Sequence, residues 1–281
     1  MTSAPARSRY LTLGGHEVHL LDWGAEDAPA LVMWHGLART CRDFDTAARA
    51  LADGFRVICP DTIGRGLSAW SKAPEQDYTV PAYVGHAVEM LDKLGIDRVR
   101  WVGTSMGGLV GMLAAAGPLA GRMERLVLND IGPVLNHEAV ERIRAYVGQV
   151  PAFATMAEME AFLRFVYAPF GALSDAEWRL MAETSSRRRD DGSLTVHYDP
   201  AVMRVFAEAT AAPMDLWPVY DVIACPTLCL RGATSDLLLA ETADEMTRRG
   251  PKARLVTVDG CGHAPALNTP DQLAQLRAFL A

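Results

Sequence analysis

The sequence predicts an α/β fold in which helices cover both faces of a mostly parallel sheet. Three observations point to it. Short apolar runs alternate with amphipathic stretches through the first half of the chain, the alternation stops for a block of helical segments, and it resumes towards the C-terminus. With 281 residues, 50% of them hydrophobic and 22% charged, the composition is that of an ordinary globular protein, which excludes disordered and fibrous classes.

The expected elements follow in alternating order on both sides of the middle block. The apolar runs have strand length and are rich in β-branched residues, and the stretches between them show helical spacing of apolar positions. We expect strands at 17–23, 30–34, 56–59, 98–102, 125–128, 227–231 and 255–258, and helices at 43–51, 80–94, 107–116, 240–248 and 270–280.

The middle block shows helical periodicity only. Helices are expected at 138–148, 157–167, 175–184 and 201–209, with no clear strand among them. The later strands continue the interrupted alternation, so they complete the same sheet. The prediction is one α/β core made of residues 1–133 and 216–281, with residues 134–215 inserted as a helical cap, or lid.

The net charge of the chain limits the kinds of molecule that it can bind. The chain has 27 Lys and Arg against 34 Asp and Glu, and the net charge of −7 opposes sequence-independent binding to nucleic acid or anionic lipid. The basic run from Arg187 to Arg189 is followed directly by Asp190 and Asp191, so we interpret it as a solvated loop. We expect neither a nucleic-acid nor a membrane partner.

Targeting and cofactor motifs are absent from the sequence. No stretch reaches the roughly 18 apolar residues of a membrane helix, and no secretory signal follows the N-terminus. Five cysteines are an odd number without metal-ligand spacing, which indicates reduced, mostly buried thiols. Neither H-E-x-x-H nor an early G-x-G-x-x-G is present. We expect a cytoplasmic protein with no metal and no cofactor.

The segment Gly103-Thr104-Ser105-Met106-Gly107 has the form G-x-S-x-G and lies between an expected strand and an expected helix. This is the context of a nucleophile elbow, a sharp strand-to-helix turn that holds its central serine in strained backbone angles. Side chains two positions away would collide in that turn, which explains the two glycines. Ser105 is therefore the expected nucleophile.

A serine hydroxyl needs a base to take its proton and a carboxylate to orient that base. His263 lies just past the last expected strand, among small residues that leave its ring free to reach the carboxyl edge of the sheet. Asp236 follows the strand at 227–231 in a Gly-x-x-Ser-Asp segment. The chain order Ser105, Asp236, His263 is the order that accompanies this elbow, so these three are the expected catalytic residues.

With these segments in place, the chain resembles the α/β-hydrolase fold family, specifically serine esterases and lactonases with a helical cap. Residues 35–39 (H-G-L-A-R) resemble the family's H-G-x-x-R oxyanion loop, and residues 61–68 (D-T-I-G-R-G-L-S) resemble its D-x-x-G-x-G-x-S loop. The resemblance implies a sheet of about eight strands. It also implies an oxyanion hole formed by the backbone N–H groups of Leu37 and Met106, with the dipole of the following helix adding to the field at Met106.

Several residues have a second interpretation. Asp130 ends the strand at 125–128 and could supply the acid in place of Asp236, because some members of this fold draw it from that strand; its segment equally fits the cap entrance. Asp61 is expected to order its own loop. No catalytic role is assigned to His16, His19, His86, His137 or His197. Aromatic residues of the insertion could line an acyl pocket or pack the cap: Phe153, Phe162, Phe165, Tyr167, Phe170 and Trp178.

The sequence thus predicts an enzyme that hydrolyses a small carboxylic ester or lactone through an acyl-enzyme on Ser105. His263 would deprotonate Ser105 and then the attacking water, and Asp236 would orient His263. The serine argues against the dehalogenases and epoxide hydrolases of this fold, which place a carboxylate at the elbow. Enol-lactones and oligoesters of short hydroxyacids remain open as substrates.

Two other functions are kept as alternatives. One is a hydrolase of vinylogous diketones that cleaves a C–C bond with the same triad; residues 35–39 depart from the Gly-rich H-G-x-G-P-G loop usual in such enzymes. The other is a ligand-binding protein of the same fold without turnover. The expected partner in either enzyme reading is a small molecule, and a homo-oligomer is compatible with the sequence.

Overall fold

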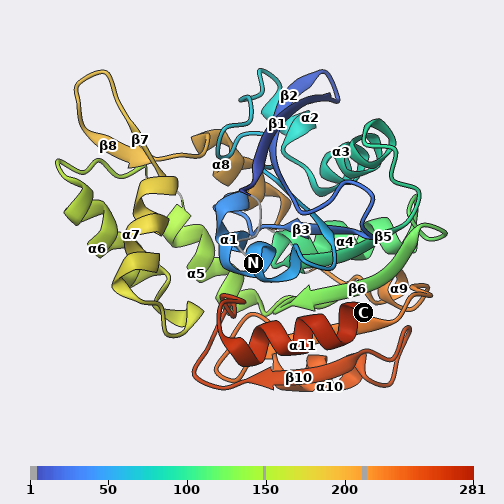
Figure 1. Cartoon of the computed structure of the whole chain (residues 1–281). Coiled ribbons are helices and arrows are strands. Elements are labelled where there is room, and N and C mark those ends of the chain that lie inside the picture. The colour runs from blue at the N-terminus through green and yellow to red at the C-terminus, as the bar shows by residue number, and fades with distance from the viewer. Residues whose placement is uncertain (1–4, 148–149, 211–213) are drawn as a thin grey trace.

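The computed structural model describes residues 5–147, 150–210 and 214–281, and within them an eight-stranded sheet organises the fold (Figure 1). The strand order is β1-β2-β4-β3-β5-β6-β9-β10. β2 is antiparallel to both β1 and β4, and the other neighbouring pairs are parallel. The mostly parallel α/β sheet is therefore confirmed. The strands are β1 (Arg7–Leu13), β2 (His16–Trp23), β3 (Ala30–Trp34), β4 (Arg56–Pro60), β5 (Val99–Thr104), β6 (Met123–Asn129), β9 (Thr227–Gly232) and β10 (Arg254–Val258).

The first strand, β1, is the one strand of the sheet that the sequence analysis misses. It lies at the edge of the sheet, and most of its side chains are exposed or half-buried. Arg7 and Arg9 both bind the buried carboxylate of Asp22 on β2. Charged edge strands of this kind are common because they discourage pairing with other molecules, and they lack the apolar run that reveals a central strand.

Helices cover both faces of the sheet, as expected. Alternate residues of β3 divide between two apolar clusters: Val32 and Trp34 belong to one, and Leu31 and Met33 to the other. The first cluster includes residues of α3, α4 and α10, and the second includes residues of α1 and α11. The helices outside the insertion are the 3-10 turn Cys41–Phe44, α1 (Asp45–Leu51), α2 (Pro74–Asp77), α3 (Val80–Lys93), α4 (Met106–Ala116), α9 (Trp217–Tyr220), α10 (Ala240–Met246) and α11 (Pro270–Leu280).

The segment between β6 and β9 is mostly helical, and no strand in its described part joins the sheet. Figure 1 shows α6, α7 and a small hairpin gathered at one side of the sheet. Its elements are α5 (His137–Val147), α6 (Met156–Val166), the 3-10 turn Ala168–Phe170, α7 (Asp175–Thr184), β7 (Ser186–Arg188), β8 (Leu194–Val196) and α8 (Pro200–Ala209). The expected end of the first helix, at Gly148, falls outside the described residues.

The expectation of an insertion without strands is wrong at the β7–β8 hairpin. Arg187 and Arg188 lie in β7 and not in a loop, and Gly192, with φ of 84°, turns the chain back towards β8. Arg187 stacks on the ring of Trp70, 4.5 Å from its centroid. Strands of three residues are too short to show a period of two, so the sequence gives no strand signal here.

Two smaller expectations can be compared with the structure. All five cysteines are free and buried, in agreement with the prediction of reduced, mostly buried thiols. Among the described residues, no helix combines the length and the apolar character needed to cross a bilayer.

The sheet topology brings the candidate site together. In parallel strands the carboxyl ends meet at one edge, and here β3, β5, β6, β9 and β10 lead at that edge into the segments that carry the expected functional residues.

Candidate active site

The turn between β5 and α4 has the strained geometry expected of a nucleophile elbow. Ser105 adopts φ of 52° and ψ of −116°, a region that side chains disfavour. A Cβ atom on Gly103 would lie 2.2 Å from the carbonyl oxygen of Gly107, and one on Gly107 would lie 2.0 Å from that of Trp34. Both neighbours are backbone atoms, so these two positions require glycine.

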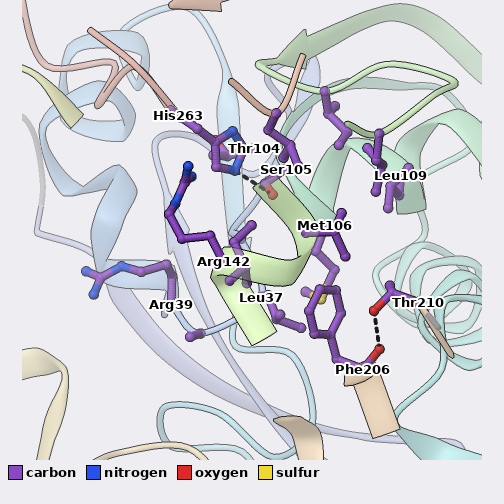
Figure 2. A pocket seen from close by; sticks show the side chains of 18 of the residues that line it. Leu37, Arg39, Thr104, Ser105, Met106, Leu109, Arg142, Phe206, Thr210 and His263 are labelled. Atoms are coloured by element: carbon purple, nitrogen blue, oxygen red, sulfur yellow. Dashed lines mark hydrogen bonds between the residues drawn. The ribbon is translucent and has the colours of Figure 1, made fainter. Parts of the chain in front are cut away.

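Ser105, His263 and Asp130 form a continuous chain of hydrogen bonds. Ser105 Oγ lies 2.9 Å from His263 Nε2, and His263 Nδ1 lies 2.8 Å from Asp130 Oδ2. Figure 2 shows the His263 ring directed at the Ser105 hydroxyl. Because a carboxylate can only accept, Nδ1 carries the proton and Nε2 is left to accept from Ser105. The imidazole therefore has the tautomer that a general base requires.

Asp236 does not occupy the position that the sequence analysis expects. Its carboxylate binds Arg142 of α5, with Nη2 and Oδ1 3.0 Å apart, and its side chain is 43% exposed. The residue before it, Ser235, is buried and donates its hydroxyl to Asp130. The loop after β9 thus turns Ser235 inward and Asp236 outward, and the acid at His263 comes from the neighbouring strand β6.

The Asp130 carboxylate is fully buried and well supplied with donors. The backbone N–H of Gly232 donates to Oδ1 at 2.7 Å, while Ser235 and His263 donate to Oδ2. A buried carboxylate requires such partners to offset its lost hydration. The Gly-x-x-Ser segment after β9 therefore holds the acid in place without being its source.

The residues expected for the oxyanion hole lie beside Ser105. Met106 is the first residue of α4, where backbone N–H groups lack partners within the helix. Leu37 follows β3 and lines the same pocket as Ser105 and Met106. A Cβ atom on Gly36 would lie 3.7 Å from Ser105 Cβ, so this loop passes directly along the serine.

Two buried side chains fix the peptide groups of the oxyanion loop. His35 Nε2 accepts from the Thr62 backbone N–H at 2.9 Å, so Nδ1 carries the proton and donates to the Gly36 carbonyl at 2.7 Å. In a trans peptide the N–H points opposite to the carbonyl, so this bond sets the direction of the Leu37 N–H. Arg65, which is fully buried, donates from Nε to the Leu37 carbonyl at 2.9 Å.

A large apolar cavity opens above these groups. Its volume is about 860 Å³, and Ser105, Met106 and His263 line it together with residues of α5, α8 and the segment after α6 (Figure 2). Three of the aromatic residues considered above line it, namely Phe165, Tyr167 and Phe170. Of the other three, Trp178 belongs to the large apolar cluster, and Phe153 and Phe162 pack against it. Further apolar lining comes from Leu109, Leu113, Ile131, Leu135, Val140, Ile143, Phe206, Leu216 and Leu237.

Asp61 orders its own loop, as expected. It accepts backbone N–H bonds from Cys41 and Leu67, and His19 Nδ1 donates to it at 2.7 Å. His19, Cys41 and Asp61 are the group whose ligand atoms, within the described residues, lie close enough to hold a metal ion. Burial and then the Asp61 charge raise the pKa of the Cys41 thiol well above its usual value, which disfavours the thiolate that a metal would need. His19 Nε2 faces Ser8 Oγ at 2.9 Å, so both its ring nitrogens are engaged.

The remaining histidines are not among the residues that line the cavity. Within the described chain, none of His16, His86, His137 and His197 lines it. His197 Nδ1 accepts from the Gly66 backbone N–H at 2.9 Å, and burial, followed by the charge of Arg39, lowers the pKa of His197 to about 3. Arg142 is a charged cavity residue that was not predicted, because one arginine in an amphipathic helix carries no signal of its own.

Comparisons with known proteins identify the family of the chain. The model of the alpha/beta hydrolase family matches residues 31–276. The chain belongs to this family. A 3-hydroxybutyrate-oligomer hydrolase of Cupriavidus necator is 42% identical over 270 residues, which cover 93% of this chain and 92% of that protein.

Two solved structures show the same fold over almost the whole chain. An alpha/beta hydrolase of Novosphingobium aromaticivorans superposes with a TM-score of 0.87 at 36% identity, covering 99% of this chain and 98% of that one. An enol-lactonase of Burkholderia xenovorans has a TM-score of 0.76 at 25% identity, covering 97% and 99%. The α/β-hydrolase fold and an enzyme acting on ester bonds, both expected from the sequence, are confirmed.

Proposed function

We propose that this hydrolase cleaves short oligoesters of hydroxy acids, of the 3-hydroxybutyrate kind, through an acyl-enzyme on Ser105. The observation that carries the proposal is the hydrogen-bonded chain from Ser105 through His263 to Asp130 at the base of an apolar cavity. The 42% identity to a 3-hydroxybutyrate-oligomer hydrolase supports the substrate class. A cavity of about 860 Å³ has room for a ligand of several such units.

The geometry supports a two-step mechanism. Ser105 Oγ attacks the ester carbonyl carbon while its proton passes to His263 Nε2, and the backbone N–H groups of Leu37 and Met106 bind the oxyanion. When the intermediate collapses, the C–O bond breaks and the leaving alcohol takes the proton from His263. Water then attacks the acyl group, His263 accepts its proton, and the second collapse returns that proton to Ser105 and releases the acid.

The parts of the site have separate roles in this mechanism. Asp130 holds the His263 tautomer and stabilises the imidazolium that forms in both steps. The two oxyanion donors each contribute about 3 kcal/mol to the transition state. We also propose that residues 134–215 act as a cap that shapes the cavity, because α5, α8 and the segment after α6 supply much of its lining. The five buried thiols are consistent with the cytoplasmic location predicted from the sequence.

The test is a panel in which the products are identified by chromatography. The purified protein and its Ser105→Ala variant are incubated with 3-hydroxybutyrate dimer and trimer, p-nitrophenyl butyrate, an enol-lactone and a vinylogous diketone. We expect the oligoesters to give 3-hydroxybutyrate with the highest kcat/KM, and the variant to give none above background. A higher kcat/KM for the lactone, turnover of the diketone alone, or binding without turnover would each overturn the proposal in favour of the corresponding alternative.

A further inference from the structure

Two arginines line the cavity within the described part of the chain, and they differ in how far they are engaged. Arg39 is 4% exposed, donates from Nε to Asp43 at 2.9 Å and from Nη1 to Ser185 at 3.0 Å, and stacks over the Tyr167 ring. Its charge is thus matched by Asp43, and its donors are engaged by Asp43 and Ser185. Arg39 therefore serves to join the oxyanion loop to the insertion.

Arg142 is more exposed than Arg39, and its guanidinium is paired with a single side chain, that of Asp236. Its terminal nitrogens face both carboxylate oxygens of Asp236, and the two side chains are 42% and 43% exposed. Both residues line the cavity that holds Ser105 and His263, and Figure 2 shows Arg142 among these lining side chains. An ion pair exposed to this degree contributes little to stability, so its partners separate at little cost.

The pairing has a geometry that a ligand can reproduce. A guanidinium binds a carboxylate through two parallel N–H···O bonds, and a free carboxylate on a ligand presents the same two oxygens as Asp236. Apolar residues close to Arg142 in the sequence, Leu135, Val140 and Ile143, also line the cavity. A bound ligand would displace water from the cavity, and the lower local dielectric would strengthen the new pair.

We propose that Arg142 is the specificity residue of the cavity, and that it exchanges Asp236 for the free carboxylate of an acidic ester substrate. This inference rests on the function proposed above, and it narrows the substrate class to esters with an unesterified carboxyl end. A 3-hydroxybutyrate dimer has such an end, with two carbon atoms between the ester oxygen and the free carboxyl group. The Asp236 carboxylate binds the Arg142 guanidinium when no substrate is bound, and it competes with the substrate carboxylate for that guanidinium.

The test compares two substrates that differ in this charge alone. 3-Hydroxybutyrate dimer carries the carboxylate, and its terminal primary amide keeps the same scissile ester with nearly the same shape. The variants are Arg142→Gln and Asp236→Asn. Arg204→Gln is the matched control, because Arg204 of α8 also forms an exposed ion pair that links the insertion to the core, with Glu75 of α2, and neither residue lines the cavity.

The measured quantity is the ratio of kcat/KM for the acid to that for the amide. We expect Arg142→Gln to lower this ratio about tenfold, mainly through KM of the acid. We expect Asp236→Asn to raise it, because the competitor is removed, and Arg204→Gln to leave it at the wild-type value. The two members of the pair therefore shift selectivity in opposite directions.

The outcomes that overturn the inference are distinct from failure of the proposed function. If Arg142→Gln and Asp236→Asn lower the rates of both substrates alike, the pair is a structural link and not a binding group. If neither variant changes the ratio, Arg142 does not contact the substrate. If the wild-type protein cleaves neither substrate while it hydrolyses another ester, the proposed substrate class itself is wrong. Circular dichroism of each variant confirms that it is folded.

Discussion

Ser235 donates its hydroxyl to Oδ2 of Asp130, the same oxygen that His263 Nδ1 contacts at 2.8 Å. The acid therefore comes from the end of β6, while the loop after β9 supplies the groups that hold it. β6 and β9 are neighbours in the sheet, so the two loops meet at the same edge. Of the two aspartates that follow these strands, Asp130 contacts His263 and Asp236 contacts Arg142, while Ser235 points inward to Asp130.

The contact between Asp130 and His263 implies that activity depends more on Asp130 than on Asp236. We predict that Asp130→Asn lowers kcat for p-nitrophenyl butyrate by about four orders of magnitude, because an amide at this position favours the wrong His263 tautomer. Asp236→Asn should lower it less than about tenfold, since its carboxylate faces Arg142. Steady-state kinetics of both variants at one pH provide the measurement. A larger loss in Asp236→Asn would return the acid to the loop after β9.

The nucleophile is tested by Ser105→Ala. We predict a fall in kcat of about four orders of magnitude or more, because the oxyanion donors alone leave only a small residual rate. The fold should be preserved, since the substitution removes one oxygen and the strained turn itself is held by Gly103 and Gly107. Initial rates and thermal unfolding are measured on the same preparation. Full activity in a preparation free of wild-type enzyme would contradict the mechanism.

The sequence predicts the central fold because its signals there are local. Runs such as β3 (Ala30–Trp34) are apolar throughout, as strands buried on both faces must be, and every strand expected from such a run is present within two residues of its predicted bounds. The elbow is also a local feature, since two glycines at fixed spacing around Ser105 follow from backbone collisions alone.

The sequence does not predict features that depend on which side chains meet in space. Asp130 and Asp236 each follow a strand, and only the packed loop shows that Ser235 points inward and Asp236 outward. Arg142 becomes a candidate binding group only because it lines a cavity whose other lining residues come from segments distant in sequence. Both cases depend on tertiary contacts that residue spacing does not encode.

The elbow glycines allow a stability test with an internal control. A Cβ atom on Gly107 would lie 2.0 Å from the Trp34 carbonyl oxygen, so Gly107→Ala must displace backbone, and we predict a loss of about 3 kcal/mol or more in the free energy of unfolding. Gly85 lies in α3 with no atom within 4 Å of its would-be Cβ. Gly85→Ala should therefore raise the free energy of unfolding by up to about 1 kcal/mol. Urea denaturation of both variants measures this, and equal effects would show that the elbow tolerates a side chain.

The buried histidines predict how stability depends on pH. Burial lowers the pKa of His35 to about 4 and that of His197 to about 3, from an ordinary value of 6.5. Each His35 ring nitrogen already has a partner that fits the neutral form, because Nε2 accepts from Thr62 and Nδ1 donates to Gly36. A proton on Nε2 would face the Thr62 N–H, so protonation is resisted in the folded state.

The free energy of unfolding depends on pH because the folded and unfolded chains bind different numbers of protons. Below pH 6.5 the unfolded chain binds protons at these histidines while the folded chain does not, so the free energy of unfolding falls as the pH falls from 6.5 towards 4. At pH 5 the loss is about 2 kcal/mol for each fully buried histidine, at about 1.4 kcal/mol per pH unit. The ordinary pKa of Asp and Glu lies near 4, so carboxylates contribute little between pH 7.5 and 5.

We therefore predict that urea unfolding of the wild-type protein shows a clear loss of stability between pH 7.5 and pH 5.0. His35→Gln should be less stable at pH 7.5, because it loses the paired ring, and its further loss on going to pH 5.0 should be smaller by about 2 kcal/mol. His137, which is exposed at the start of α5, provides the control, and His137→Gln is expected to keep the wild-type difference. A His35→Gln protein with the full wild-type difference would mean that His35 is protonated as readily in the folded chain as in the unfolded one.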